Sequence, residues 1–235
     1  MNSKNIFLSF DIDGTLINCT NGREIQRNSL LYAFNKFFGR KVDPKDMFGP
    51  MRVGITDSLT AKGIIEKHKG SCTTQDVSNF LKSYDNHFLN SDLEIPEVLP
   101  GIIDVLQKVR QINGVTVGLA TGNTRETAKF KLEKAKLLQY FDPFIGGFGD
   151  NTYRWLCIHQ AKRVAQIIKK SNFYHAIHIG DTHDDVESAL KAGAHPIGVM
   201  TGNGATVYTP GMKYFVKDLK QDQNVLFDMI RRLQQ

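Results

Sequence analysis

Short apolar runs that alternate with helical patterns constrain the fold of this chain more than any other feature of its sequence. Such alternation is typical of βαβ units, in which parallel strands form a sheet and helices cover both of its faces. The strand-like runs lie at residues 6–10, 115–120, 175–179, 196–200 and 214–216, and a shorter apolar piece at 143–146 is a candidate for one more strand. The sequence therefore predicts an α/β protein with a parallel sheet.

The stretch after the first strand interrupts this alternation. Amphipathic helical runs without strand-like alternation lie near residues 24–38, 56–68 and 74–90. Turn-forming and rigid residues punctuate both ends of the stretch. We therefore predict two units, an α/β core formed by residues 1–16 and 97–235 and a helical domain inserted at residues 17–96.

The charge of the chain limits the classes of partner. Its 235 residues carry a formal net charge of +6, which could indicate nucleic-acid binding. However, lysines such as Lys129, Lys131, Lys134 and Lys136 are dispersed at helical spacing without interleaved aromatic residues. This pattern favours solvated helix faces, so we expect no nucleic-acid partner. A positive surface would still attract anionic substrates.

The distribution of apolar residues and cysteines indicates where the protein works. No stretch approaches the roughly 20 apolar residues that a membrane span needs, and the first residues lead into a strand without a signal-peptide pattern. Cys19, Cys72 and Cys157 are odd in number and far apart, which argues against a disulfide framework and a zinc site. We expect a soluble, cytoplasmic protein that does not bind membranes, and the sequence leaves its oligomeric state open.

Two aspartates directly follow the first predicted strand. Asp11 and Asp13 would lie at the carboxyl end of that strand, where open α/β sheets bind their ligands. Crowded carboxylates repel one another unless a cation or a shared proton neutralises them. A calcium loop of the EF-hand type is excluded, because Gly14 is fourth rather than sixth in the run and Gly22 replaces the twelfth-position glutamate. The pair therefore predicts a divalent-metal site.

Four segments together resemble the motifs of the haloacid dehalogenase superfamily of aspartate-nucleophile hydrolases. Residues 11–16 (Asp-Ile-Asp-Gly-Thr-Leu) resemble the first motif, and residues 119–123 (Leu-Ala-Thr-Gly-Asn) the second. Residues 148–155 are similar to the third motif and residues 177–185 to the fourth. All four occur in the family's order over most of the chain. In appearance the sequence is most similar to the phosphoglycolate phosphatase and β-phosphoglucomutase branch.

The resemblance implies a fold and a reaction. It implies a Rossmann-like sheet with an α-helical cap that is inserted after the first motif and closes over the sheet edge. It also implies Mg²⁺ held by Asp11, Asp13 and Asp181. In the implied reaction, Asp11 attacks phosphorus and forms an aspartyl-phosphate, while Asp13 protonates the leaving alkoxide and then activates water. Covalent catalysis by a carboxylate with a neighbouring acid and base is chemically reasonable from the pair alone.

The second motif would bind the phosphoryl group. By the resemblance, Thr121 donates its hydroxyl to a phosphoryl oxygen, and the backbone N–H groups of Gly122 and Asn123 assist near a helix N-terminus. Asn123 is also a plausible N-cap of the following helix, with Glu126 three residues on.

The third and fourth motifs supply the remaining expected site residues. Arg154 would clamp the phosphoryl group, with Lys162 or a cap residue as the alternative cation, and Asp185 would orient the arginine or a metal-bound water. Arg52 is the only cation of a loop similar to the one that related caps present to substrate, so it is a possible substrate contact. The seven histidines receive no role.

Several functions compete on this evidence. The leading hypothesis is a Mg²⁺-dependent phosphatase that acts on a small phosphorylated metabolite. A sugar-phosphate mutase of the same family is the nearest alternative, because an aspartyl-phosphate can also be returned to a sugar hydroxyl. Dehalogenation and phosphonate cleavage are disfavoured by the presence of Asp13, and no cap lysine is compelling for the latter. A non-catalytic binding protein is a further alternative, although five polar residues at sheet-edge loops argue against it.

Overall fold

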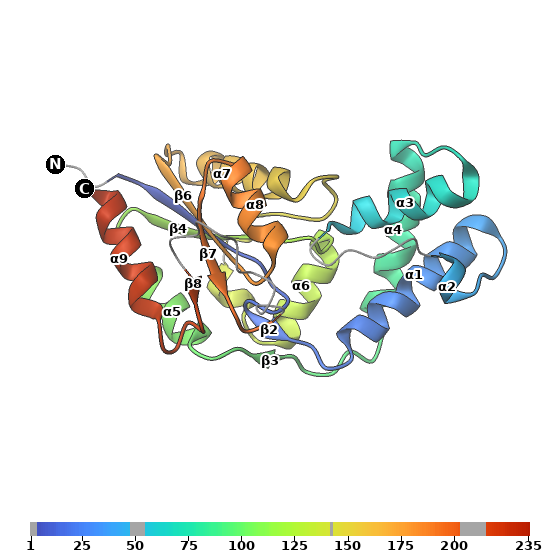
Figure 1. The fold of residues 1–235 in the computed structure, drawn as a ribbon, viewed down its shortest axis with the longest axis horizontal. Coiled ribbons are helices and arrows are strands. Elements are labelled where there is room, and N and C mark those ends of the chain that lie inside the picture. The colour runs from blue at the N-terminus through green and yellow to red at the C-terminus, as the bar shows by residue number, and fades with distance from the viewer. Residues whose placement is uncertain (1–3, 48–54, 142, 203–214) are drawn as a thin grey trace.

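The protein is a parallel sheet covered by helices, with a helical unit at one end (Figure 1). The computed structural model describes residues 4–47, 55–141, 143–202 and 215–235. Its six-stranded sheet has the order β5-β4-β1-β6-β7-β8, and each neighbouring pair is parallel. The strands are β1 (Ile6–Phe10), β4 (Val115–Ala120), β5 (Gly146–Gly147), β6 (His175–Gly180), β7 (His195–Val199) and β8 (Phe215–Val216). The predicted α/β class is confirmed.

The strand predicted at residues 143–146 is displaced. Only Gly146 and Gly147 pair with β4. The residues before them turn tightly, because the amide of Ile145 donates to the carbonyl oxygen of Pro143 at 2.7 Å. A proline has no N–H to contribute to a sheet, so pairing begins after this turn.

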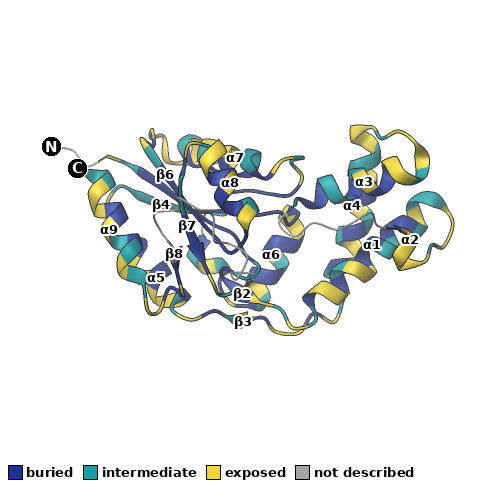
Figure 2. Ribbon diagram, in the orientation of Figure 1, coloured by how far each residue is buried: buried dark blue, intermediate teal, exposed yellow. Residues whose placement is uncertain are grey.

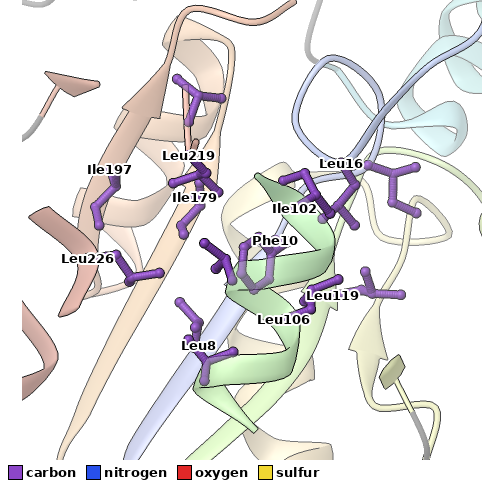
Figure 3. Packing of buried hydrophobic residues seen from close by; sticks show 14 of the residues in the cluster. Leu8, Phe10, Leu16, Ile102, Leu106, Leu119, Ile179, Ile197, Leu219 and Leu226 are labelled. Atoms are coloured by element: carbon purple, nitrogen blue, oxygen red, sulfur yellow. The ribbon is translucent and has the colours of Figure 1, made fainter. Parts of the chain in front are cut away.

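Helices cover both faces of the sheet, as the alternation of side chains along β1 requires. Ile6, Leu8 and Phe10 belong to the larger hydrophobic core, with residues of α5, α6 and α9 (Figure 3). Phe7 packs in a second cluster, with residues of α7 and α8. The helices of this part are α5 (Ile102–Val109), α6 (Arg125–Lys134), α7 (Arg154–Lys169), α8 (His183–Lys191) and α9 (Gln223–Gln234), with a short 3₁₀ helix at Leu138–Phe141.

The inserted region forms a helical cap with its own hydrophobic cluster. Its helices are α1 (Gly22–Phe38), α2 (Pro44–Met47), α3 (Asp57–Lys69) and α4 (Thr74–Leu89). Buried faces of these helices meet inside the cap, where aromatic side chains such as Phe34, Phe80 and Tyr84 are fully covered (Figure 2). An antiparallel ribbon of β2 (Ile17–Asn18) and β3 (Glu97–Val98) connects the cap to the sheet. The exact division at residues 17–96 stays a prediction.

The order of the central strands brings the sequence motifs together. β1 lies between β4 and β6, and in register Phe10 is opposite both Leu119 and Ile179. The residues that follow these three strands, which include Asp11, Thr121 and Asp181, therefore emerge side by side at one edge of the sheet. Along the described parts of the chain, no helix combines the length and apolar composition needed to cross a membrane.

A substitution at Gly147 would test how closely α7 approaches the sheet edge. A Cβ at Gly147 would lie 1.8 Å from the carbonyl oxygen of Cys157, which is backbone and cannot rotate away. We expect Gly147→Ala to lower the free energy of unfolding by about 1–3 kcal/mol in denaturant titrations. The matched control is Gly63→Ala in α3, where a Cβ meets nothing within 4 Å and a gain of about 0.5–1 kcal/mol is expected. An unchanged midpoint for Gly147→Ala would contradict this packing.

Candidate active site

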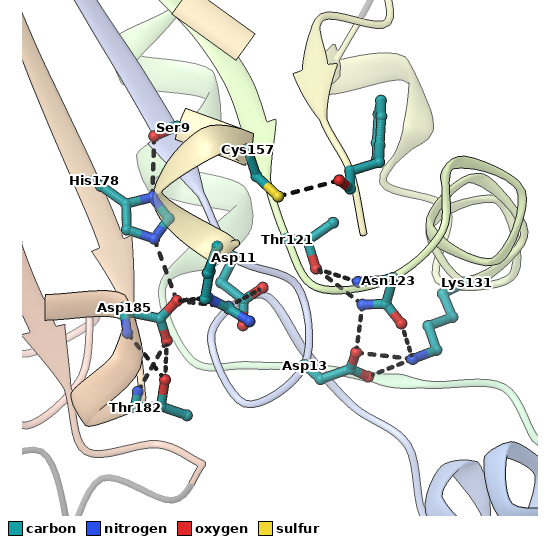
Figure 4. A network of polar contacts seen from close by, with 12 residues as sticks. Ser9, Asp11, Asp13, Thr121, Asn123, Lys131, Cys157, His178, Thr182 and Asp185 are labelled. Carbon is teal, nitrogen blue, oxygen red and sulfur yellow. Dashed lines mark hydrogen bonds and ion pairs between the residues drawn. The ribbon is translucent and has the colours of Figure 1, made fainter. Parts of the chain in front are cut away.

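Three buried carboxylates form the centre of the site. Oxygen atoms of Asp11, Asp181 and Asp185 all lie within 4.8 Å of one another, and Figure 4 shows Asp11 beside Asp185. Asp11 follows β1 and Asp181 follows β6, while Asp185 lies in the first turn of α8. Asp185 is fixed by the capping box of α8, in which its Oδ2 accepts from the Thr182 amide at 3.0 Å and from the Thr182 hydroxyl at 2.6 Å.

Arg154, the first residue of α7, joins two of these carboxylates. Its Nη2 lies 2.7 Å from Asp11 Oδ1 and 2.5 Å from Asp185 Oδ1, and its Nε donates to the same Asp185 oxygen at 2.6 Å. The sequence predicted Arg154 as the cation of the site and Asp185 as its partner, and the structure places both residues there. Lys162, the alternative cation, is not among the described residues that line the cavity.

Burial and the charge of Arg154 act in opposite directions on the pKa values of this cluster. Burial raises the pKa of Asp11 to about 7, although the charge of Arg154 opposes the rise. Burial also acts to raise the pKa of Asp185, but Arg154 and then His178 outweigh it and hold that pKa well below its usual range. Among the described residues, Asp11 and Asp185 form ion pairs with Arg154, and Asp185 also contacts His178. The crowding of three buried carboxylates favours a bound cation.

Asp13 takes part in a separate ion pair. Its two carboxylate oxygens accept from Lys131 Nζ at 2.9 and 2.8 Å, and Oδ2 also accepts from Asn123 Nδ2 at 2.8 Å. Burial would raise the pKa of Asp13, but the charge and hydrogen bonds of Lys131 lower it overall. The carboxylate of Asp13 is thus held by Lys131, and its predicted part in metal binding stays a prediction.

The prediction that Lys131 lies on a solvated helix face is wrong. Lys131 is only 5% exposed, and its Nζ also donates to Asn123 Oδ1 at 2.8 Å and lies 5.5 Å from the ring centre of Phe88. A signal was available in the sequence, because Lys131 stands three residues after Ala128 and four before Ala135 and so shares their apolar face. On that face a lysine needs an acidic partner within reach of its Nζ.

The second motif forms a tight polar loop. Thr121 is fully buried, and its Oγ1 accepts from Asn123 Nδ2 at 2.9 Å. A Cβ at Gly122 would lie 2.6 Å from the carbonyl oxygen of Ile55, so only glycine fits there. The prediction that Asn123 caps the next helix is wrong, because its amide is committed to the site and Thr124 caps α6 instead, accepting from the Thr127 amide at 3.2 Å.

A buried polar chain that the sequence did not reveal lies behind the acidic cluster. His178 Nε2 lies 3.3 Å from Asp185 Oδ1, and its Nδ1 lies 3.0 Å from Ser9 Oγ. Ser9 and His178 are register partners on β1 and β6, so their side chains point to the same face of the sheet. Strand pairing could have brought the two residues together, whereas the spacing of the histidines along the chain could not.

The cap closes over this edge through the N-terminus of α3. The amides of Asp57 and Ser58 donate to the carbonyl oxygens of Gly122 and Gly149 at 2.9 and 2.8 Å. In return, Asp57 Oδ2 accepts from the Thr124 amide at 2.9 Å. A cavity of about 620 Å³ extends from Asp11 and Asp181 to the cap. The predicted contact residue Arg52 lies outside the described residues.

Comparisons with known proteins agree with this architecture. The family model described as "Haloacid dehalogenase-like hydrolase" matches residues 8–199. A predicted phosphatase from Clostridium acetobutylicum is similar in structure, with a TM-score of 0.65 and 25% identity over 96% of this chain and 99% of that one. Pyrophosphatase PpaX of Bacillus cereus (strain B4264) is 23% identical over 78% of each chain. Phosphonoacetaldehyde hydrolase of the same strain is 28% identical, but the match covers 45% of this chain and only 39% of that protein.

The ion pair of Lys131 can be tested through stability. We expect Lys131→Met to lower the free energy of unfolding by about 1–3 kcal/mol, because Asp13 and Asn123 lose the donor that satisfies their oxygens. Lys129→Met makes the same chemical change on the solvent side of α6, where Lys129 pairs with Glu133, and should shift stability by less than about 0.5 kcal/mol. Equal effects of both substitutions in denaturant titrations would contradict the special role of Lys131.

The raised pKa of Asp57 predicts that the stability of the protein depends on pH. Burial raises this pKa from 3.8 to about 7, although the hydrogen bond from Thr124 opposes the rise. Between about pH 4 and pH 7 the folded protein holds a proton that the unfolded chain releases, so stability falls as the pH rises through this range and levels off above about pH 7. We expect Asp57→Asn to reduce the loss of stability between about pH 5 and pH 8 by up to about 2.5 kcal/mol. Parallel curves of unfolding free energy against pH for both proteins would contradict this assignment.

Proposed function

Because the chain belongs to the haloacid dehalogenase-like hydrolase family, we propose that it is a Mg²⁺-dependent phosphatase that hydrolyses a small phosphomonoester through an aspartyl-phosphate on Asp11. The observation that carries this proposal is the cluster of three buried carboxylates beside the cavity, which Asp11 and Asp181 line, with Arg154 bound to Asp11. An acidic group on a rigid sheet edge, next to a fixed cation and a cavity, suits phosphoryl transfer.

The donor set fits Mg²⁺. Asp11, Asp181 and Asp185 offer only carboxylate oxygens, which are the ligands that Mg²⁺ prefers, and their charge exceeds that of Arg154. Asp11 and Asp181 would hold the ion, with Asp185 beside them. When bound, the ion would neutralise charge on the phosphoryl group, which otherwise repels a carboxylate nucleophile.

The residues of the chain then divide the reaction into two steps. In the first step, an oxygen of Asp11 forms a bond to phosphorus, the bond from phosphorus to the leaving oxygen breaks, and Asp13 gives a proton to the leaving alkoxide. In the second step, Asp13 takes a proton from water, whose oxygen attacks phosphorus and releases Asp11. Arg154 and the hydroxyl of Thr121 bind the phosphoryl oxygens throughout.

Ester hydrolysis is better supported than phosphonate cleavage, although some curated relatives are named phosphonoacetaldehyde hydrolase. The matches to those relatives cover 39% to 42% of their length. Cleavage of an aldehyde substrate through an imine would require a lysine, and the amine of that lysine must be able to lose its proton. Among the described residues that line the cavity, the only lysine is Lys131. Asp13 raises the pKa of Lys131 despite its burial, so its amine stays protonated.

Turnover of phosphate esters tests the proposal. We expect the purified protein with Mg²⁺ to release phosphate from at least one member of a panel of sugar phosphates, nucleotides, phosphoglycolate and an aryl phosphate. Chelation of Mg²⁺ should abolish release. Asp11→Asn should lower it roughly a thousandfold or more, because the amide is a far weaker nucleophile.

Two controls make this test decisive. Lys36→Gln changes a charged residue in the cap, far from the carboxylates, and should retain activity. Phosphate release that is equal in wild type and Asp11→Asn would contradict the proposed nucleophile. Conversion of one sugar phosphate into an isomer, without release of phosphate, would instead identify the mutase alternative, which phosphorus NMR of the reaction mixture would detect.

A further inference from the structure

One face of α1 forms part of the cap side of the cavity. Arg23, Gln26, Arg27 and Leu30 all line it, and their spacing of three and four residues places them on the same side of the helix. Since Asp11 and Arg154 line the same cavity from the sheet side, a phosphate ester bound at Asp11 would direct its leaving group toward this face.

The cations that line the cavity from the sheet side, Arg154 and Lys131, already form ion pairs with carboxylates. Arg154 binds Asp11 and Asp185, and Lys131 binds Asp13. By contrast, Arg27 has no ion-pair partner among the described residues. Asp57 is the carboxylate that lines the cavity from the cap side. It accepts hydrogen bonds from two uncharged donors, the amide of Thr124 and the side chain of Gln26. Glu24 is the acidic residue of the first turn of α1, but no ion pair joins it to Arg27 among the described residues, and the two arginines give this end of the helix an excess of positive charge.

The cavity itself has the size of a small-molecule site. Its volume of about 620 Å³ falls within the range of roughly 300–1,000 Å³ that is common for such sites. Guanidinium groups one helical turn apart present planar sets of donors that match carboxylate and phosphate oxygens. A neutral leaving group would offer the guanidinium of Arg27 no charged partner, so this side of the cavity is better suited to an anion.

We infer that the leaving group of the substrate carries a second anionic group, a carboxylate or a further phosphate, and that Arg23 and Arg27 bind it. This assignment rests on the proposed function, because it presumes that the phosphoryl group to be transferred lies at Asp11. It narrows the substrate class from phosphomonoesters in general to those with an anion at the far end of a short carbon chain.

Binding to a protein without the proposed nucleophile tests the inference independently of turnover. The probes are 3-phosphoglycerate and glycerol 3-phosphate, which differ only in a carboxylate against a hydroxymethyl group, and a second pair, propanediol bisphosphate and hydroxypropyl phosphate, which tests a phosphate in the same way. With Mg²⁺-loaded Asp11→Asn protein, calorimetry should give at least about tenfold tighter binding for the member of one pair that carries the second anionic group.

Substitutions in α1 should remove this preference selectively. Adding Arg27→Gln is expected to reduce the affinity ratio to about threefold or less, and Arg23→Gln with Arg27→Gln to about one. Arg27→Lys, which keeps the charge but loses the planar donors, should retain part of the preference. Lys36→Gln, the matched charge removal in α1 outside the cavity, should leave the ratio unchanged. Thermal melts check that each variant folds.

The outcomes separate this inference from the proposed function. Equal affinities within both pairs, failure of all four probes to bind, or a ratio that Arg27→Gln leaves intact would overturn the anion site, even if the wild type releases phosphate. An affinity ratio that depends on Arg27, in a protein whose wild type releases no phosphate from any ester, would support the anion site and refute the phosphatase.

Discussion

The contact of Arg154 with Asp11 and Asp185 is the interaction on which the rest of the site depends. Three carboxylates buried at one sheet edge would repel one another, and a single guanidinium at 2.5–2.7 Å offsets part of that repulsion. The contact requires α7 to begin at the sheet edge, and the close approach of Gly147 to Cys157 in α7 makes that placement possible. Backbone packing and electrostatics therefore specify the same position for α7.

The two aspartates of the first motif have different environments although one residue separates them. Asp11 is buried among acids and its pKa is raised, whereas Asp13 is paired with Lys131 and its pKa is lowered. The proposed nucleophile has to be ionised and the proposed acid has to carry a proton, so a cation bound at Asp11 and a substrate bound beside Asp13 have to reverse these two directions. Lys131 offsets the negative charge of Asp13, and Arg154 offsets part of the negative charge of the acidic cluster. The two ion pairs therefore hold the two aspartates in separate environments.

Local patterns in the sequence predicted most of the fold and the motif residues. The strands at 6–10 and 115–120 and the cap helices followed from periodicity, and the four motifs identified Asp11, Thr121 and Arg154 as neighbours. The buried role of Lys131 and the contact of His178 with Asp185 were missed, because both depend on which helix face or strand register lies against the site. Tertiary packing determines which helix face and which strand register lie against the site, and the spacing of residues along the sequence specifies this only indirectly.

The hydrogen bonds between α3 and the second-motif loop connect substrate selection with chemistry. The amide of Asp57 donates to the carbonyl of Gly122, and the amide of Thr124 donates back to Asp57, so the loop that follows β4 is held from the cap side as well as from the sheet. A cap that moved away would release both bonds and expose a buried carboxylate. Because α1 and α3 share the hydrophobic cluster of the cap, the helix that carries Arg27 and the helix end that contacts the second-motif loop belong to one packed unit, so a displacement of one would be transmitted to the other.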